Sequence, residues 1–111
     1  MQLRESFRTA TILINDTTSD VVPLRARMVV GFIMPAAFTG TTITFTGCAT
    51  VDGTFVGIRD SNNNPVSVTV VVSTGYGLSG AEADAVAAFP FIRLVSGSTE
   101  VAARSITVLM K

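Results

Sequence analysis

Alternating apolar and polar positions in residues 41–73 are the clearest structural signal in this chain. Ile43, Phe45 and Gly47 fall on one face of an extended segment, and threonines occupy most of the other face. Side chains two residues apart in a strand point to the same side, so this alternation predicts a half-buried strand.

Two turn signals divide the remainder of that stretch. Asp52-Gly53 tolerates the positive φ that a tight hairpin turn requires, and residues 60–65 (DSNNNP) are typical of a second turn. An apolar segment at 54–58 lies between the turns, and four valines after them share one face: Val66, Val68, Val70 and Val72. The stretch therefore predicts a three-stranded antiparallel meander.

Similar alternation predicts strands elsewhere in the chain. Residues 8–14 place Ala10, Ile12 and Ile14 on one face. Residues 24–34 give the longest expected strand, with Leu24, Ala26, Met28, Val30, Phe32 and Met34 on one side, and Pro35 ends it. Two final strands are expected at 91–95 and 104–110, joined by a polar loop at 96–100.

One helix interrupts this series of strands. Ser79 and Glu82 match the spacing of a capping box, which predicts a helix over 81–89 that Pro90 closes. Short strands at this spacing, with Gly, Asn and Pro turns, predict an all-β fold: an antiparallel β-sandwich of jelly-roll type with one short helix. We expect a single domain over 1–111, with residues 1–7 as an N-terminal arm; the alternative for residues 1–6 is the start of an edge strand.

Composition changes the picture of the surface. Only 14% of the residues are charged and 48% are hydrophobic, against a charged fraction of about 25% in typical soluble domains. We therefore expect some apolar surface to be buried against another chain; a surface covered by Thr, Ser, Asn and Gly is the alternative. Arginine supplies nearly all the positive charge, and several arginines are expected to be interface anchors.

Net charge is zero, which gives no electrostatic basis for nucleic-acid binding. The longest apolar stretch, 28–38, is shorter than a membrane span, which needs about 20 residues. The N-terminal residues MQLRESFR lack the pattern of a secretory signal. We expect neither a nucleic-acid partner nor a membrane partner.

The sequence contains little that catalysis or cofactor binding could use. It has no histidine and a single cysteine, Cys48, which we interpret as a buried, inert thiol. Residues 60–65 begin like a calcium loop, but Pro65 replaces the required glycine. Asp52 and Asp60 occupy turn positions that favour aspartate for local reasons. We expect a non-enzymatic protein without cofactor or metal.

The segments ITFTGCATVDGTFVGIRDSNNNPVSVTV and FIRLVSGSTEVAARSITVLMK resemble small proteins of tailed bacteriophages. The shared features are the ITF strand, the DG turn, the VSVTV strand, and the final F-I-R-L-V-S-G and A-A-R-x-I-T-V segments. The chain looks most like the small capsid decoration, or staple cement, proteins of epsilon15-like short-tailed phages.

This resemblance implies a jelly-roll protein on the outer capsid surface of a virion, made in the cytoplasm of the bacterial host. It would bind a major capsid protein of HK97-like fold, form a homodimer at two-fold positions and staple neighbouring capsid subunits. For such a protein we expect Phe7, Arg25 and Arg27 to contact the partner. A carbohydrate- or receptor-binding sandwich of a tail fibre or spike is the alternative function.

Overall fold

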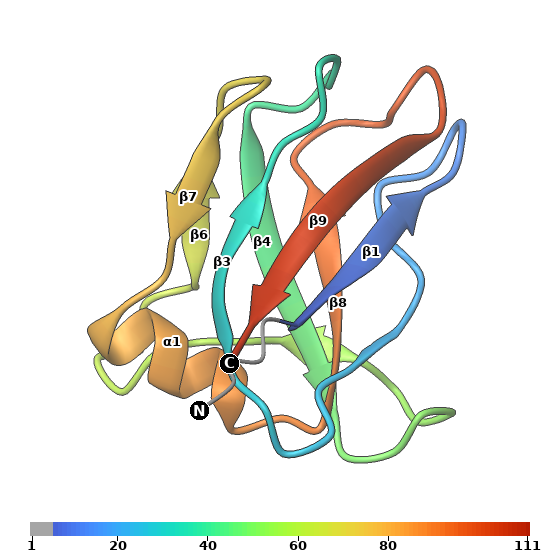
Figure 1. Cartoon of the computed structure of the whole chain (residues 1–111). Helices are drawn as coiled ribbons and strands as arrows, with labels where there is room; N and C mark the ends of the chain where they lie inside the picture. The colour runs from blue at the N-terminus through green and yellow to red at the C-terminus, as the bar shows by residue number, and fades with distance from the viewer. Residues whose placement is uncertain (1–5) are drawn as a thin grey trace.

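Two antiparallel sheets packed face to face form the body of the protein, with one short helix at one end (Figure 1). The computed structural model describes residues 6–111. In chain order the elements are β1 (Ser6–Ile12), β2 (Val22–Pro23), β3 (Val29–Ile33), β4 (Thr42–Cys48), β5 (Val56–Gly57), β6 (Ser67–Thr69), β7 (Gly75–Gly77), α1 (Gly80–Ala87), β8 (Phe91–Ser96) and β9 (Arg104–Met110). The predicted all-β sandwich with one helix is confirmed.

The strand pairs are nested in the sequence: the first strand pairs with the last, and each following pair joins strands that are closer together in the chain. β1 pairs with β9, β2 with β8, β3 with β7, and β4 with both β5 and β6. Additional pairing of β3 with β9 and of β4 with β8 completes the sheets β1-β9-β3-β7 and β2-β8-β4-β5, with β6 also beside β4. This nested order is that of a jelly roll, as the sequence predicts.

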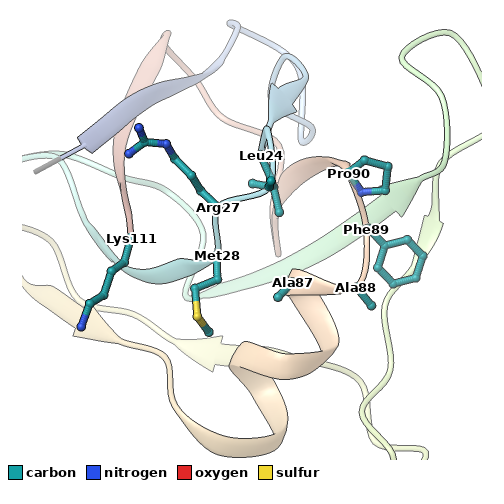
Figure 2. A pocket seen from close by; sticks show the side chains of 9 residues that line it. Leu24, Arg27, Met28, Ala87, Ala88, Phe89, Pro90 and Lys111 are labelled. Atoms are coloured by element: carbon teal, nitrogen blue, oxygen red, sulfur yellow. The ribbon is translucent and has the colours of Figure 1, made fainter. Parts of the chain in front are cut away.

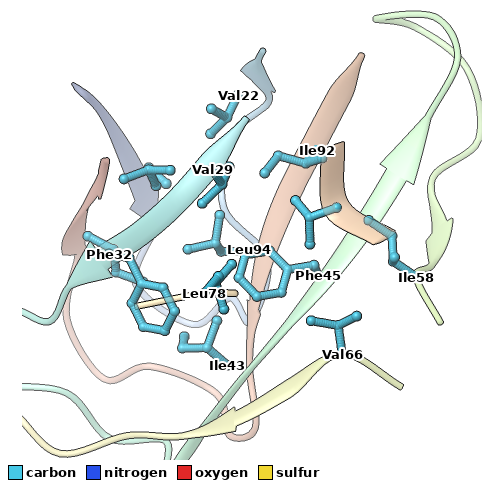
Figure 3. Packing of buried hydrophobic residues seen from close by; sticks show 14 of the residues in the cluster. Val22, Val29, Phe32, Ile43, Phe45, Ile58, Val66, Leu78, Ile92 and Leu94 are labelled. Carbon is cyan, nitrogen blue, oxygen red and sulfur yellow. The ribbon is translucent and has the colours of Figure 1, made fainter. Parts of the chain in front are cut away.

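The hydrophobic core fills the space between the two sheets (Figure 3). Ile43 and Phe45 are buried, as their alternation in the sequence predicts. Phe32 of β3 meets Phe45 of β4 edge-on, with ring centroids 6.1 Å apart, so the two sheets touch through an aromatic pair. Pairs of this geometry add about 0.5–1.5 kcal/mol to the free energy gained by burying their area.

The predicted three-stranded meander is wrong. β5 and β6 both lie along the same edge of β4, because β8 occupies its other edge. Residues 60–65 form the predicted turn, in which Asp60 Oδ1 accepts hydrogen bonds from the N–H groups of Asn62 and Asn64 at 2.9 and 3.0 Å. After this turn the chain continues along the same edge of β4, in the same direction as before. β5 and β6 are therefore two parts of one interrupted strand.

The expected long strand over 24–34 is also shorter than predicted. Arg25 and Ala26 adopt left-handed φ values of 52° and 63°, which form a turn before β3 begins at Val29. The pairing of β3 with β9 also shifts register between Val29 and Gly31. Alternation of residue types cannot reveal such a turn, because hydrophobic residues on both sides of it still point into the core.

The remaining differences are local. β1 ends at Ile12, so Ile14 is exposed rather than buried. A loop at 49–55, rather than a tight turn at Asp52-Gly53, joins β4 to β5. The helix forms near its predicted position, but Ser79 makes no side-chain cap hydrogen bond. The next residue, Gly80, has a left-handed φ of 56°, so the chain does not enter the helix in the geometry of a capping box.

The predicted N-terminal arm is only partly within the described residues. Residues 1–5 lie outside them, whereas Ser6 and Phe7 belong to β1 and pair with Met110 and Leu109 of β9. Ser6 and Phe7 begin β1, which lies at the edge of its sheet, so of the two predicted possibilities the start of an edge strand is the one that forms here.

Candidate interaction surface

Within the described residues of its four strands, the sheet β1-β9-β3-β7 carries no charged residue on its outward side. Ala10, Ile12, Ile106, Val108 and Phe32 point into the core, so the alternate residues of these strands point outward. The outward-facing set, called the outer face below, is Phe7, Thr9, Thr11, Ile33, Gly75, Gly77, Ser105, Thr107 and Leu109. Antiparallel sheets that face water usually alternate apolar-in and polar-out, and charged side chains commonly supply part of that polarity.

Strand register places the apolar members of the outer face close together. Phe7 lies opposite Leu109, and Thr107 lies between Thr9 and Ile33. Phe7 is 66% exposed and Ile33 is 44% exposed. Gly75, opposite Ile33 in β7, adds no side chain, so one flank of the isoleucine stays open. Depletion of charge with exposed aromatic and aliphatic groups is typical of the centre of a protein interface.

The three predicted partner contacts do not lie on one surface. Phe7 belongs to the outer face. Arg25 and Arg27 lie outside it, in the turn that precedes β3, where Arg25 is exposed and Arg27 is half-buried. The sequence pattern predicts both arginines at the polar end of a long strand over 24–34. The structure has a turn there instead, so this part of the predicted strand does not form.

A shallow cavity of about 390 Å³ lies beside this turn (Figure 2). Its apolar lining includes Leu24 and Met28 from the turn and Phe89 and Pro90 from the end of the helix. The side chains of Arg27 and Lys111 extend away from these apolar residues rather than across them. Arg27 and Lys111 also line the cavity, at the side away from Phe89 and Pro90.

Several other arginines are engaged within the chain. Arg59 donates to the carbonyl of Asn63 at 2.8 Å, and the Arg93 guanidinium carbon lies 4.7 Å from the centre of the Phe55 ring. Arg104 pairs with Glu100. Arg59 and Arg104 therefore have hydrogen-bond partners within the chain, whereas the buried Nε of Arg93 has none; whether arginines anchor a partner stays a prediction.

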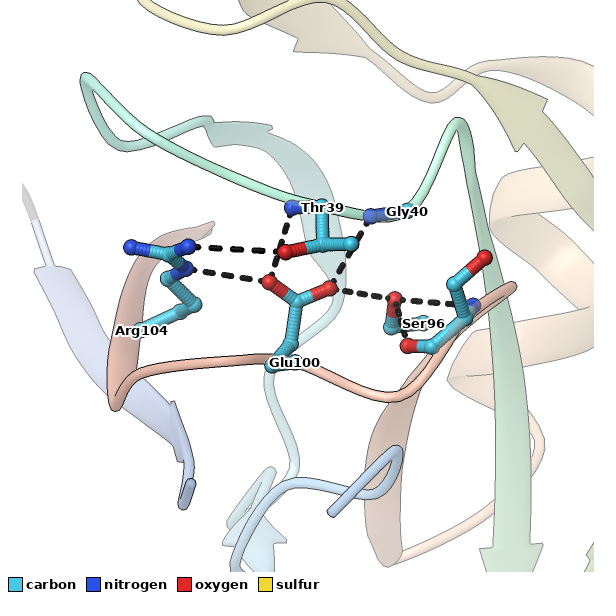
Figure 4. Close-up of polar contacts among 6 residues, drawn as sticks. Thr39, Gly40, Ser96, Glu100 and Arg104 are labelled. Carbon is cyan, nitrogen blue, oxygen red and sulfur yellow. Dashed lines mark hydrogen bonds and ion pairs between the residues drawn. The ribbon is translucent and has the colours of Figure 1, made fainter. Parts of the chain in front are cut away.

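Glu100 is a fully buried carboxylate that joins two loops (Figure 4). Its Oε1 accepts from the Thr39 N–H at 2.8 Å and from Arg104 Nε at 3.0 Å. Its Oε2 accepts from the Gly40 N–H at 3.0 Å and from Ser96 Oγ at 2.8 Å. These five residues, called the Glu100 cluster below, tie the loop between β3 and β4 to the loop between β8 and β9.

Opposing effects set the pKa of Glu100. Burial raises the pKa, whereas hydrogen bonds from Thr39, Ser96, Gly40 and Arg104 lower it, and together these bonds hold it below its ordinary value of 4.5. Hydrogen bonds to a carboxylate favour the charged form. The carboxylate is therefore the form that stabilises the fold.

Acidification should weaken this stabilisation. Because the pKa is lower in the folded state, the contribution of Glu100 is complete above its ordinary pKa of 4.5 and is lost as the pH falls through the folded-state value. We expect the melting temperature to fall below pH 4.5 more steeply for the wild type than for Glu100→Gln, as measured by circular dichroism. Parallel pH profiles for the two proteins would contradict this assignment.

Sequence reasoning missed the Glu100 cluster. Residues 96–100 (SGSTE) resemble an ordinary polar loop, and the four-residue spacing of Glu100 and Arg104 has meaning mainly on a helix, which is not formed here. The partners on the other loop are backbone N–H groups of Thr39 and Gly40, and backbone groups leave no trace in residue types.

Other residues considered for chemistry have structural roles. Cys48 is buried, as predicted, and its sulfur lies 4.0 Å from Thr50 Oγ1. The Tyr76 hydroxyl accepts from the Val71 N–H at 2.7 Å, and its ring lies 5.6 Å from that of Phe32. Within residues 6–111, no helix is long and apolar enough to cross a membrane.

Comparison with known proteins does not identify a family: no family model, no curated protein and no solved structure matches the chain. Its function is therefore inferred from the surface chemistry of the fold and from the resemblance in roughly its last seventy residues.

Proposed function

We propose that the protein is a non-enzymatic structural component of a tailed-phage virion. It binds the outer surface of a capsid built from a major capsid protein of HK97-like fold and staples neighbouring subunits. The observation that carries this proposal is the uncharged outer face with its exposed Phe7 and Ile33. It agrees with the resemblance to staple cement proteins.

Burial of the outer face supplies the binding energy in this proposal. Complete burial of a Phe or Ile side chain contributes about 1.5–3 kcal/mol. No charge among the listed residues of this face has to be desolvated when a partner covers it, and the hydroxyl groups of its threonines and serine need hydrogen-bond partners in the interface. Many copies around a shell add such modest contacts into a large effect, and binding only to the assembled shell stabilises that shell by mass action.

A rigid platform favours this role. The seven-residue ladder between β1 and β9 fixes two of the four strands beneath the outer face. The Glu100 cluster holds the loops that enter β4 and β9. A surface that is already ordered loses less conformational entropy on binding.

Glycan binding through a tyrosine platform is less well supported. Tyr76 is the only tyrosine and the chain has no tryptophan. Its hydroxyl is bonded to Val71 and its ring packs beside Phe32, so it contributes to the fold.

A charge placed on the outer face should abolish capsid binding. We expect Ile33→Asp to lower the apparent affinity for capsids at least about 10–100-fold, since each factor of ten corresponds to about 1.4 kcal/mol. Capsids purified without this protein would be mixed with each variant, and bound protein would be quantified by sedimentation and by cryo-microscopic occupancy of the outer shell.

Val56→Asp is the matched control, because Val56 is 54% exposed but lies on β5 in the other sheet. Ile33→Asp should melt at least about 4–8 °C below the wild type, because loss of this half-buried side chain costs about 1 kcal/mol or more, so binding of both variants would be compared well below their melting temperatures. Wild-type binding by Ile33→Asp would show that the outer face does not contact the capsid. A native particle whose outer shell lacks this chain would disprove the proposed function.

A further inference from the structure

One arginine on the sheet opposite the outer face has no acidic partner. Arg93 is the only charged residue in the strands of the sheet β2-β8-β4-β5 and in β6 beside it. Asp16 and Asp20 line a cavity with Arg93, yet neither forms an ion pair with it. Among the described residues, therefore, no acid is paired with the positive charge of Arg93.

The Arg93 side chain crosses β4 and is held against the sheet. Its strand, β8, lies on one edge of β4, and Phe55 directly precedes β5 on the other edge. The guanidinium carbon lies 4.7 Å from the centre of the Phe55 ring, in a cation–π contact. Thr46 of β4 lies opposite Arg93, and both Thr46 Oγ1 and Arg93 Nε are buried without a hydrogen-bond partner. The guanidinium is thus fixed in position before any partner binds.

Partial burial leaves this guanidinium with an incompletely solvated charge. A buried donor has lost its water, and without a partner it gains no hydrogen bond in exchange. Nε of Arg93 is in this state, whereas the terminal nitrogens Nη1 and Nη2 are not among the buried unpartnered atoms. An anion at the terminal nitrogens therefore interacts more strongly than it would with a freely hydrated arginine. Little side-chain entropy is lost on binding, because the contact with Phe55 already orients the group.

Open space lies beside the guanidinium. Gly57 follows Phe55 by two residues, so it lies on the same side of the strand, and it is opposite Thr46. A Cβ atom at Gly57 would meet nothing within 4 Å. A side chain of a partner can therefore reach the terminal nitrogens of Arg93 by passing over Gly57.

We propose that the stacked guanidinium of Arg93 binds a carboxylate of a partner protein, an Asp or Glu side chain that enters over Gly57. The planar fork of arginine matches a carboxylate with two parallel hydrogen bonds. A lone cation on an otherwise uncharged sheet fits a lone acid on a protein surface, whereas phosphate backbones are bound by clusters of cations. The inference rests on the proposed function for the identity of the partner, a capsid subunit, and gives the staple a second contact on the sheet opposite the outer face.

Substitution of Arg93 tests the contact directly. Arg93→Gln should lower the apparent affinity for capsids purified without this protein about 10–100-fold, the range expected for lost hydrogen bonds to a charged group. Arg93→Lys keeps the charge but lacks the fork, so it should lose most of the affinity as well. Binding by the wild type should weaken between about 0.1 M and 1 M salt, over which the Debye length falls from about 10 to 3 Å. Binding by Arg93→Gln should show little of this salt dependence.

Gly57→Val blocks the approach without changing the arginine. Gly57 has no left-handed φ, and valine is favoured in strands, so the melting temperature should not fall. Capsid binding should fall as it does for Arg93→Gln. Arg8→Gln is the matched control, because Arg8 is an exposed arginine of β1 in the other sheet, and it should bind as the wild type does.

The outcomes separate this inference from the proposed function. Wild-type affinity in Arg93→Gln and Gly57→Val, together with lost binding by Ile33→Asp, would overturn the inference and leave the proposed function standing. Equal losses for Arg8→Gln and Arg93→Gln would show that net charge rather than this site attracts the capsid, and full binding by Arg93→Lys would overturn the bidentate contact. A wild type that does not bind capsids would disprove the proposed function, and the capsid partner of Arg93 with it.

Discussion

Replacing Glu100 by alanine should lower the free energy of unfolding by about 3–5 kcal/mol, the usual cost of removing one partner from a buried ion pair. The substitution leaves the N–H groups of Thr39 and Gly40 without their acceptor, whereas the Ser96 hydroxyl can still donate to the Ser98 carbonyl at 2.8 Å. Arg104 loses its ion-pair partner as well. Small domains are stable by about 5–15 kcal/mol in total, so this loss is a large fraction of the whole.

Urea denaturation followed by circular dichroism would measure the change. Asp84→Ala is a suitable control, because Asp84 is an exposed acid on α1 and its removal should change stability by less than about 0.5 kcal/mol. Glu100→Gln keeps the shape of the side chain and separates loss of charge from loss of volume. A shift of less than about 1 kcal/mol for Glu100→Ala, within the range of ordinary substitutions, would show that the two loops do not depend on this carboxylate.

Phe32→Ala should destabilise the protein by about 3–5 kcal/mol, the usual cost of truncating a core phenylalanine. Phe32 is fully buried and contacts the ring of Phe45 in the opposite sheet and that of Tyr76 in the neighbouring strand. Its removal leaves a cavity at the aromatic contact between the sheets. The fluorescence of Tyr76, the only tyrosine, gives a probe of unfolding at that point.

Ile33→Ala is the matched control, because Ile33 follows Phe32 in the same strand but points outward and is 44% exposed. About half of its side chain is already in water, so we expect a loss of about 1 kcal/mol. The pair of residues should therefore separate the stability that depends on Phe32 from the capsid binding that we propose for the face carrying Ile33. If both variants lowered the free energy of unfolding equally, Phe32 would contribute no more to the core than the half-exposed Ile33.

Strands with an uninterrupted alternation were predictable from the sequence. Residues 91–95 and 104–110 match β8 and β9 to within one residue, and Ile43 and Phe45 are buried as predicted. In these segments each side chain's burial follows from its position along a straight strand, which is a local property. Phe7 is exposed on the outer face, and its contact with a partner stays a prediction.

Predictions failed where the backbone departs from a straight strand. The pattern of residues 24–34 passes through the turn at Arg25 and Ala26, so Arg25 and Arg27 were placed on a strand that does not form there. Gly75 and Gly77 lie outside the predicted strands, yet they belong to β7 because β3 provides ladder partners for them. The alternation of residue types predicts neither a left-handed φ nor a distant strand partner.

The sequence by itself determined the fold class of this protein and the side of most strands that enters the core. Period-two alternation fixes those features within a single strand, without reference to any other part of the chain. Only the tertiary structure decided which strands lie side by side, and this produced the uncharged outer face, the contact of Arg93 with Phe55 and the burial of Glu100. Each of these features joins residues far apart in the chain, and such pairings depend on how the whole jelly roll closes rather than on any local pattern.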